Sequence, residues 1–502
     1  MSSVIEPVAN RRPPGLGRIV VYQSGRRTVL SLDAFDALAR RTAVHLLDCG
    51  VRAGDRVGIV AKNGLEWALL DIAALKIKAV TAGFEVDKVV VDADLIKRFG
   101  LRLVFADKPS AHERARPIQA LLPSLEGLPT DPDLPPVAYA PDDVTTIKFT
   151  SGSTGRPKGL AARAGSIDCS ITAVQTLFGH CPGDALLVFL PLSLLQQRYW
   201  IYSALVFGHD IVVSASEFAF HALKREAPTV VMGVPAFFDT LCKAIAARVE
   251  SDDSGALRAQ AREVVGDRIR YLWTGSAPAN PDTLAFLDRC GLKIFEGYGL
   301  NETCIVAKNA PGAHRVGSVG RPVSGKHVAI DPEGVIVVRS DEPVNASYLF
   351  CEPGESERIF RLDGSVRTGD LGRFDADGFL YVLGRADDVV VLANGRNVMV
   401  RPVEERLRSC PAVADCIVAG SGLDRLAAIV CPNQQADARE VIGRHVAMLN
   451  KAAASDERIG GLVLANEPFS VENGLLTSQF KPRRKAILAR YRDELAETAG
   501  GV

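Results

Sequence analysis

The stretch that decides the fold is Thr150-Ser151-Gly152-Ser153-Thr154-Gly155-Arg156-Pro157-Lys158-Gly159, which directly follows an apolar segment with the composition of a strand. Its glycines permit unusual backbone conformations, and its hydroxyl and N–H groups are hydrogen-bond donors. Lys158 adds a positive charge. This composition predicts a loop that wraps nucleotide phosphates. It is not the phosphate loop of P-loop NTPases, because glycine rather than Ser or Thr follows its lysine.

On both sides of this loop, short β-branched runs alternate with helical patterns. This alternation predicts an α/β fold with largely parallel sheets. The predicted strands are 57–61, 101–106, 146–150, 186–190, 211–214, 230–233, 269–273 and 293–295, and the predicted helices include 31–47, 67–77 and 280–287.

The texture of the chain changes after Gly297. Strand-like pieces then follow closely, broken by Gly, Pro and Asp, which predicts a barrel-like subdomain. These pieces are 327–330, 335–339 and 379–383. From Gly384 on, we expect a small α+β domain. Its predicted elements are a helix at 402–409, strands at 416–418 and 427–430, and a basic helix at 482–495.

With the loop and five further segments in the same order, the chain resembles the adenylate-forming superfamily, which includes acyl-CoA synthetases, peptide-synthetase adenylation domains and beetle luciferases. The resemblance implies a large domain, residues 1–385, that binds ATP and an organic acid. It also implies a small mobile domain, residues 386–502, that carries a catalytic lysine and turns about a hinge at Asp387. The implied reaction condenses the acid with ATP to an acyl adenylate and releases pyrophosphate.

The segment Phe295-Glu296-Gly297-Tyr298-Gly299-Leu300-Asn301-Glu302-Thr303 is similar to the family's adenine and magnesium motif. Its glycines let the backbone pass close to a base, and Tyr298 offers a ring for stacking. Glu302 supplies a hard oxygen for Mg²⁺. The family usually has Thr where this chain has Asn301. The segment Gly275-Ser276-Ala277-Pro278 resembles the one that lines the adenine and acyl pockets.

Two further segments resemble the family's ribose-binding and catalytic motifs. Arg367-Thr368-Gly369-Asp370-Leu371-Gly372 contains a carboxylate, Asp370, that can accept hydrogen bonds from both ribose hydroxyls, and Arg385 adds a positive donor. Near the end of the chain, Asn473-Gly474-Leu475-Leu476-Thr477-Ser478-Gln479-Phe480-Lys481 resembles the segment with the catalytic lysine, which we assign to Lys481. An ammonium that bridges carboxylate and α-phosphate stabilises the transition state. Phe480 replaces the usual glycine, a departure shared with long-chain acyl-CoA ligases.

The bulk properties fit this interpretation. A chain of 502 residues needs two or more domains. Lys plus Arg and Asp plus Glu both total 59, so no net charge favours nucleic acid as a partner. The ten cysteines form no C-x-x-C pair, which argues against a zinc knuckle or disulfide framework and suits a cytoplasmic protein. We expect no secretory signal and no transmembrane segment.

The acid and the acceptor are less determined. The segment 191–198 contains Leu194 and no acidic residue for a substrate ammonium, which favours an apolar acyl or aryl acid, and 234–238 is the expected pocket wall. CoA is the expected acceptor, with a phosphopantetheinyl acyl carrier protein as the alternative. A non-catalytic adenylate-binding protein is the rival class, which Asn301 and Leu194 favour. A small-molecule acid, ATP and Mg²⁺ complete the expected ligands.

Overall fold

The computed structural model describes residues 3–86, 88–151, 157–249, 253–277, 279–433, 437–470, 472–476 and 482–499. The chain forms two compact units. The first comprises Met1–Thr368 and Arg373–Tyr381, and the second comprises Gly369–Gly372 and Val382–Val502. This division passes through two neighbouring strands, so the predicted domain boundary after residue 385 stays a prediction.

The first unit contains a nine-stranded sheet in the order β15-β14-β13-β12-β11-β9-β10-β1-β2. The strands from β13 to β1 in this order are parallel, whereas the pairs β1–β2, β13–β14 and β14–β15 are antiparallel. The strands are β1 (Arg18–Gln23), β2 (Arg26–Ser31), β9 (Ala185–Val188), β10 (Asp210–Ser214), β11 (Val230–Gly233), β12 (Tyr271–Thr274), β13 (Ile294–Leu300), β14 (Cys304–Lys308) and β15 (Arg321–Pro322). The predicted adenine segment lies in the β13–β14 hairpin, at the end of the parallel part of this sheet.

A six-stranded sheet carries the loop that opened the sequence. Its order is β6-β5-β3-β4-β7-β8, and every pair is parallel except the hairpin β7–β8. In this hairpin Thr150 lies opposite Lys158, so the predicted phosphate loop joins two antiparallel strands. The strands are β3 (Arg56–Val60), β4 (Val80–Phe84), β5 (Leu101–Ala106), β6 (Ala115–Pro117), β7 (Val144–Ser151) and β8 (Pro157–Arg163).

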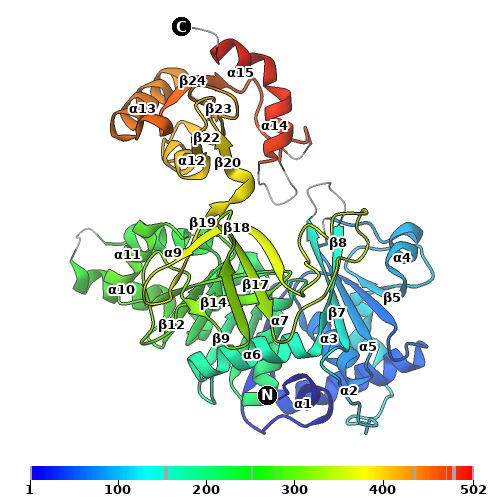
Figure 1. Ribbon diagram of the computed structural model, residues 1–502. Coiled ribbons are helices and arrows are strands. Elements are labelled where there is room, and N and C mark those ends of the chain that lie inside the picture. The colour runs from blue at the N-terminus through cyan, green and yellow to red at the C-terminus, as the bar shows by residue number, and fades with distance from the viewer. Residues whose placement is uncertain are drawn as a thin grey trace. The chain divides into compact units, whose positions relative to one another are not determined.

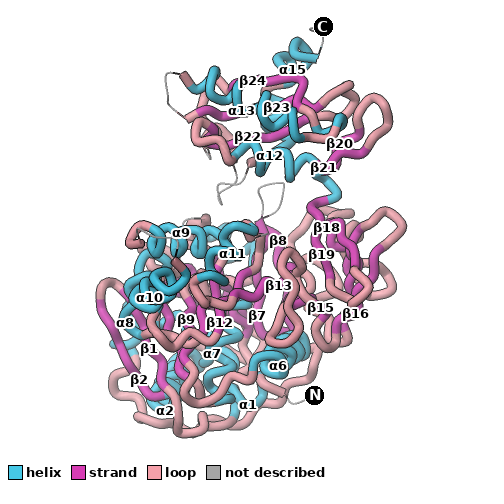
Figure 2. The backbone as a smooth tube through the Cα atoms, turned by 90° about the vertical axis from the view of Figure 1, so that its left-hand side faces the viewer, coloured by secondary structure: helices cyan, strands magenta, loops and turns pink. Residues whose placement is uncertain are grey.

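Helices cover both faces of the nine-stranded sheet because its strands are apolar on both sides. Leu186 and Val188 face a core shared with the six-stranded sheet, whereas Leu187 and Phe189 belong to a second core on the outer face. Figure 2 shows α8 to α10 on the outer side of β9 and β12, with α6 and α7 on the other side. The inner helices are α2 (Leu32–Asp48), α3 (Leu65–Lys76), α6 (Ala164–Phe178) and α7 (Leu195–Phe207), and the outer ones are α8 (Ala219–Glu226), α9 (Pro235–Ala246), α10 (Ser254–Val265) and α11 (Pro281–Arg289).

The remaining strands before the C-terminal unit form a four-stranded sheet in the order β16-β17-β18-β19. Its members are β16 (Lys326–Ile330), β17 (Val335–Ser340), β18 (Val366–Phe374) and β19 (Leu380–Arg385). This is the small sheet that the close-spaced strands predicted. The shorter helices α1 (Ile5–Asn10), α4 (Ala93–Phe99) and α5 (Leu121–Ser124) complete the first unit, which is coloured blue to yellow in Figure 1.

The second unit has a three-stranded sheet in the order β22-β23-β24 and a β20–β21 hairpin. Its elements are β20 (Val389–Val391), β21 (Asn397–Met399), α12 (Val400–Arg408), β22 (Val413–Ala419), β23 (Leu426–Pro432), α13 (Ala438–Ala452), β24 (Ile459–Leu464), α14 (Arg484–Arg490) and α15 (Arg492–Ala499). The predicted fold class is therefore confirmed: a large α/β part with a barrel-like sheet, and a smaller α+β part.

The predicted single basic helix at 482–495 is wrong. The chain breaks it at Tyr491, whose backbone leaves the helical region with φ of −106° and ψ of 25°. The Tyr491 ring is buried, lies 6.5 Å from the ring of Phe469, and its hydroxyl donates a hydrogen bond to Asn466. Burying this ring takes precedence over continuous helix geometry, and α14 and α15 result.

Within the described residues, no helix has both the length and the apolar composition needed to cross a bilayer.

Candidate functional site

The predicted adenine and magnesium motif lies on the β13–β14 hairpin, where two glycines allow a close approach of backbone. A Cβ atom at Gly299 would lie 2.2 Å from the carbonyl oxygen of Cys304, and one at Gly297 would lie 2.8 Å from Cδ of Lys308. Such separations are far below van der Waals contact, so only glycine fits at these positions as the hairpin stands. The tight hairpin ends in a turn formed by Asn301 and Glu302.

A buried lysine holds this turn in place. Nζ of Lys326, on β16, donates hydrogen bonds to the carbonyl oxygen of Thr303 at 2.9 Å and to Oγ of Ser340 at 2.7 Å. Burial lowers the pKa of Lys326. The backbone beside Glu302 is therefore fixed from the neighbouring sheet, although no local pattern in the sequence indicated it.

Glu302 and Lys158, which are far apart in the sequence, meet around Tyr348. The hydroxyl of Tyr348 donates a 2.6 Å hydrogen bond to Oε1 of Glu302. Nζ of Lys158 lies 5.2 Å from the centre of the Tyr348 ring and 2.9 Å from Oε1 of Glu355. The two charged residues that were predicted to act on phosphate and metal thus share one small region of the first unit.

The segment that carries Tyr348 and Glu355 is fastened directly to the base of the predicted phosphate loop. The backbone N–H of Gly159 donates to the carbonyl oxygen of Leu349 at 2.8 Å, and the N–H of Leu349 donates back at 2.7 Å. The N–H of Tyr348 also donates to Oγ of Ser356 at 2.7 Å. The segment therefore moves with β8, and Lys158 keeps its two neighbours.

The predicted adenine-pocket segment lies beside the same hairpin. Gly275 follows β12, which is the parallel neighbour of β13. A Cβ atom at Gly275 would lie 3.2 Å from the carbonyl oxygen of Gly297, and Ser276 adopts a positive φ of 68°. Ala277 is exposed next to them. The structure thus brings the two predicted segments into contact through backbone.

Glu296 and Tyr298 occupy different environments on β13. Glu296 is buried, burial raises the pKa of its carboxyl group, and the N–H of Gly317 donates to it at 3.4 Å. Tyr298 is half-buried nearer the turn. Behind them, Nζ of Lys308 donates to the carbonyl oxygen of Phe295 at 2.6 Å and lies 3.5 Å from the ring centre of Trp273. This lysine connects the hairpin to the wall of a neighbouring pocket.

That pocket is small, about 20 Å³, has a mixed polar and apolar lining, and lies between α7 and the ends of β11 and β12. The rings of Trp200 and Trp273 form much of its wall, with centres 5.5 Å apart. Its lining residues are Leu190, Gln196, Gln197, Trp200, Met232, Gly233, Trp273, Gly275 and Ser276. Because Gly275 and Ser276 belong to both features, the pocket opens beside the predicted adenine segment.

The sequence located this pocket only approximately. The predicted segment 191–198 does line it, but through Gln196 and Gln197 rather than Leu194. The aromatic members of the predicted wall 234–238 are not among the described lining residues, and the role of this segment stays a prediction. Phe237 and Phe238 instead pack in the outer core, where the Phe237 ring lies 4.4 Å from that of Phe189. Apolar residues of a wall and of a core look alike in sequence.

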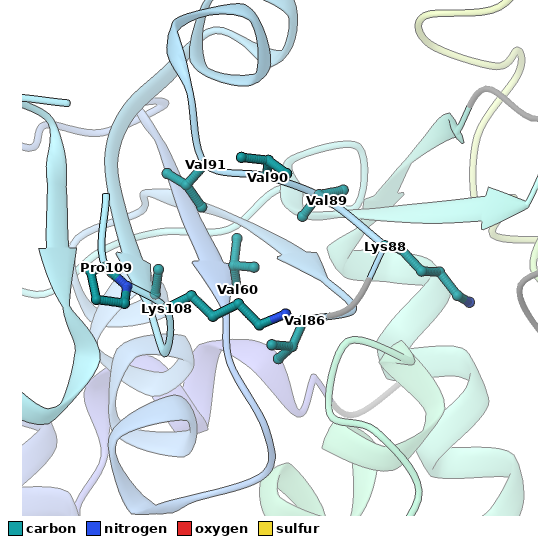
Figure 3. A pocket seen from close by; sticks show the side chains of 9 residues that line it. Val60, Val86, Lys88, Val89, Val90, Val91, Lys108 and Pro109 are labelled. Atoms are coloured by element: carbon teal, nitrogen blue, oxygen red, sulfur yellow. The ribbon is translucent and has the colours of Figure 1, made fainter. Parts of the chain in front are cut away.

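A different pocket lies at the carboxyl ends of β3 and β5 (Figure 3). In this view the Lys108 side chain extends along the pocket towards Val86, whereas Lys88 points away. The lining is completed by Val60, Val89, Val90, Val91, Ala106 and Pro109. None of the described residues predicted for the nucleotide or the acid belongs to this lining.

Asp370 and Arg385 are paired within the second unit. Nη1 of Arg385 donates to Oδ1 of Asp370 at 3.0 Å, and the Asp370 side chain is largely buried. A Cβ atom at Gly369 would lie 2.8 Å from Nη2 of Arg385, so the glycine makes room for the pair. The predicted ribose-binding role of Asp370 stays a prediction. Asp387, the predicted hinge residue, lies in a 3₁₀ helix of one turn, Ala386–Asp388.

Several predicted residues lie outside the described residues. These are Gly152, Ser153, Thr154, Gly155 and Lys481. For Thr150 and Ser151 the structure describes only the backbone, at the end of β7. The flanks of the lysine segment are described, since Leu476 and Pro482 form an isolated antiparallel bridge. The roles assigned to these residues stay predictions.

Comparison with known proteins places this geometry in a family. Residues 8–343 match the model of the AMP-binding enzyme family, and residues 387–499 match that of the AMP-binding enzyme C-terminal domain. The long-chain-fatty-acid–CoA ligase FadD15 of Mycobacterium bovis is 28% identical, over 91% of this chain and 90% of that protein. The 2-succinylbenzoate–CoA ligase of Bacillus licheniformis is 27% identical over 76% and 80%.

Solved structures share the fold. ATP-bound MatB from Rhodopseudomonas palustris has a TM-score of 0.78 at 21% identity, covering 98% of this chain and 99% of that one. The o-succinylbenzoate CoA synthetase of Bacillus subtilis in complex with AMP has a TM-score of 0.76 at 21% identity, covering 97% and 98%. Together with the family models, these matches confirm the resemblance that the motifs predicted and the predicted enzyme class, an AMP-forming acid–thiol ligase. The chain belongs to the AMP-binding enzyme family.

Proposed function

We propose that this enzyme activates an apolar acyl or aryl acid with ATP and transfers the acyl group to the thiol of CoA. In the first step a carboxylate oxygen attacks the α-phosphorus of ATP. The bond from that phosphorus to the bridging oxygen breaks, and pyrophosphate leaves. In the second step the thiol sulfur attacks the acyl carbon of the adenylate, AMP leaves, and the thiol proton is released to water.

The observation that carries this proposal is the meeting of Lys158 and Glu302 around Tyr348. A polyphosphate needs positive charge for its oxygens and a hard oxygen ligand for its metal ion. Lys158 supplies the first and Glu302 the second. Glu302 lies at the turn of a hairpin whose glycines allow its own two strands to approach closely.

The residues fit a magnesium ion that is held mainly by nucleotide. Among the described residues, no group of three or more His, Cys, Asp or Glu side chains is placed to hold a metal. Mg²⁺ bound to nucleotide usually takes one or two protein carboxylates, phosphate oxygens and water. Glu302 would hold it, and the bound ion would neutralise charge on the phosphates. In the contact described above, Tyr348 donates to one carboxylate oxygen of Glu302, Oε1.

The other predicted residues take roles around this centre. The hydroxyls and N–H groups of 150–155 would surround the phosphates, and Asp370 would accept hydrogen bonds from the ribose. Tyr298 would stack on adenine, beside Gly275. Lys481 would bridge the acid and the α-phosphate, where negative charge increases in the transition state.

The acid and the acceptor are proposed from the pocket and the relatives. The two Trp rings and Met232 present an apolar wall, which suits an acyl chain or an aromatic ring rather than a charged side chain. The relatives named above are ligases of a long-chain fatty acid and of 2-succinylbenzoate, both with CoA. CoA is therefore the acceptor we propose, ahead of a carrier protein.

ATP–pyrophosphate exchange with a panel of aliphatic and aromatic acids tests the first step. We expect exchange that depends on both the acid and Mg²⁺. If none of the tested acids supports exchange although the protein binds ATP, the protein would instead be a non-catalytic adenylate-binding protein. For the second step, thioester formation is compared with CoA and with a phosphopantetheinyl carrier protein. Transfer only to the carrier protein would contradict the proposed acceptor but not the adenylation.

A further inference from the structure

Two buried polar atoms in the pocket proposed for the acid have no hydrogen-bond partner among the described residues. They are the carboxamide oxygen Oε1 of Gln197 and the indole nitrogen Nε1 of Trp200. Gln197 is only 4% exposed and Trp200 only 2%. Burying a polar atom without a partner is unfavourable, so nearly all such atoms in folded proteins are paired with protein, water or a ligand.

The two atoms lie on the same side of one helix. Gln197 and Trp200 are separated by three positions on α7, and side chains at this spacing are neighbours on a helix surface. Both line the pocket that Gly275 and Ser276 share with the predicted adenine segment. A ligand that entered this pocket would meet an acceptor oxygen and a donor N–H close together.

The rest of the wall is mixed, with the apolar side chains of Met232 and Trp273 and the polar ones of Gln196 and Ser276. Met232 and Trp273 are buried, and the Trp273 ring packs against that of Trp200. The neighbouring polar residue Arg198 is bound elsewhere, since it donates to Asp71 at 2.8 Å and to Thr146 at 3.0 Å. Oε1 of Gln197 is left without a hydrogen-bond partner among the described residues.

We propose that the acid activated by this enzyme is an apolar skeleton bearing a hydroxyl group that binds between Gln197 and Trp200. A hydroxyl both donates and accepts, so one group can donate to Oε1 of Gln197 and accept from Nε1 of Trp200. Gln197 and Trp200 then determine specificity, and the substrate class is hydroxylated aryl or short acyl acids. This inference rests on the proposed function and makes its acid more specific.

The test measures kcat/KM for ATP–pyrophosphate exchange with matched acids. The probes are benzoate and phenylpropanoate, with their hydroxy, methoxy and chloro derivatives at each ring position, and octanoate with its terminal hydroxy derivative. A hydroxyl satisfies both atoms, a methoxy oxygen only the indole N–H, and chlorine neither. We expect at least one hydroxy acid to exceed its unsubstituted parent about tenfold or more, with the methoxy analogue in between.

Two variants separate recognition from folding. Trp200→Phe keeps an aromatic ring but removes the donor, and Gln197→Met keeps the length of the side chain but removes the acceptor. Both are expected to reduce the hydroxy-to-parent ratio of kcat/KM towards one. Trp67→Phe is the matched control. The Trp67 indole nitrogen is also buried without a partner, but Trp67 does not line the pocket, so the ratio should not change.

A ratio is informative because a purely structural loss would lower both values together. Equal kcat/KM for hydroxy and parent acids in the unaltered enzyme would overturn this inference while leaving adenylation intact. The same conclusion follows if Trp200→Phe and Gln197→Met both leave the ratio unchanged. If no acid supports exchange at all, the proposed function fails first, and the inference fails with it.

Discussion

The hydroxyl of Tyr348 is hydrogen-bonded to Glu302 at 2.6 Å, across 46 positions of sequence. A hydrogen bond to a carboxylate is stronger than one between neutral groups, and it fixes the carboxylate orientation. The same tyrosine ring faces Nζ of Lys158. One side chain thus positions both the residue proposed to hold Mg²⁺ and the residue proposed to bind phosphate.

Replacing Tyr348 by Phe should therefore weaken the response to magnesium. The ring that faces Lys158 remains, but Glu302 loses the donor that orients it. We expect the Mg²⁺ concentration for half-maximal exchange to rise about threefold to tenfold, since hydrogen bonds to charged groups contribute roughly 1.5–3 kcal/mol when buried and less when half-exposed. Titration of exchange activity with Mg²⁺ measures this. An unchanged midpoint would show that Tyr348 does not position Glu302.

Replacing Glu355 by Gln should change the affinity for ATP in the opposite direction. Glu355 pairs with Lys158 at 2.9 Å, and this pairing lowers the pKa of the Glu355 carboxyl group. ATP phosphates must compete with that carboxylate for the lysine. Without the negative charge, we expect the KM for ATP to fall about twofold to fivefold, because solvent-screened pairs of this kind contribute only modestly.

The matched control for Glu355 is Glu357→Gln, which removes the same charge from an exposed position two residues away. Steady-state kinetics at two ionic strengths compares the three proteins. A rise in the KM of the Glu355 variant would mean that the carboxylate helps ATP to bind, for instance by orienting Lys158. That result would contradict competition between Glu355 and phosphate.

Lys481→Ala is expected to remove most adenylate formation and to leave ATP binding largely intact. Loss of one group that stabilises transition-state charge typically reduces kcat by roughly a hundredfold to a thousandfold. Exchange kinetics and equilibrium ATP binding test the two halves of this expectation. Lys485→Ala, at an exposed position of α14, is the control. Full activity of the Lys481 variant would remove this residue from the chemistry.

His180 should make the first unit less stable as the pH falls. Burial, followed by the nearby His209, lowers the pKa of His180 to about 3, from 6.5 for an ordinary histidine. Between these values the unfolded chain binds a proton that the folded chain does not. Folding stability therefore falls with pH below about 6.5, by roughly 1.4 kcal/mol per pH unit at most.

In His180→Asn this contribution is absent, so the midpoint of thermal unfolding should depend less on pH between 6.5 and 4.5. The comparison is made against the unaltered chain and against His221→Asn, which removes an exposed histidine. Parallel pH profiles of the His180 variant and the unaltered chain would show that this histidine is not the group responsible.

Alanine substitutions at two glycines should distinguish a glycine that close backbone packing requires from one that it does not. In Gly299→Ala the new methyl group meets backbone of Cys304, so the β13–β14 hairpin must shift and both stability and exchange activity should fall. In Gly443→Ala the new methyl group meets no described atom within 4 Å outside its own helix backbone, and the position is inside α13. That variant should be stabilised by about 0.5–1 kcal/mol. Thermal unfolding and exchange assays distinguish the two.

The sequence was informative where an element is formed by residues adjacent along the chain. Short apolar runs located the central strands, and β5 and β11 have the predicted bounds. Other elements were missed. The β1–β2 hairpin, β4 and α6 were not predicted as elements, although β1 contains the β-branched run Ile19-Val20-Val21.

The candidate site was predictable only in its linear motifs. Asn301, Glu302 and the glycines could be identified from one short segment. Tyr348, Glu355 and Lys326 could not, because each acts on a residue that only folding brings near. The same holds for Gln197: its sequence position was noted within 191–198, but its lack of a partner is a property of the packed structure.

Helix α7 serves two different parts of the enzyme with adjacent residues. Arg198 ties the helix to Thr146 on β7, the strand that leads to the predicted phosphate loop, whereas Gln197 and Trp200 line the pocket proposed to bind the acid. Exchanges at the two pocket-facing positions can therefore alter which acid is accepted without loosening the nucleotide-binding part. A change at Arg198 would disturb both. Substitutions that change the accepted acid should therefore concentrate at these two positions, about one turn apart on this helix.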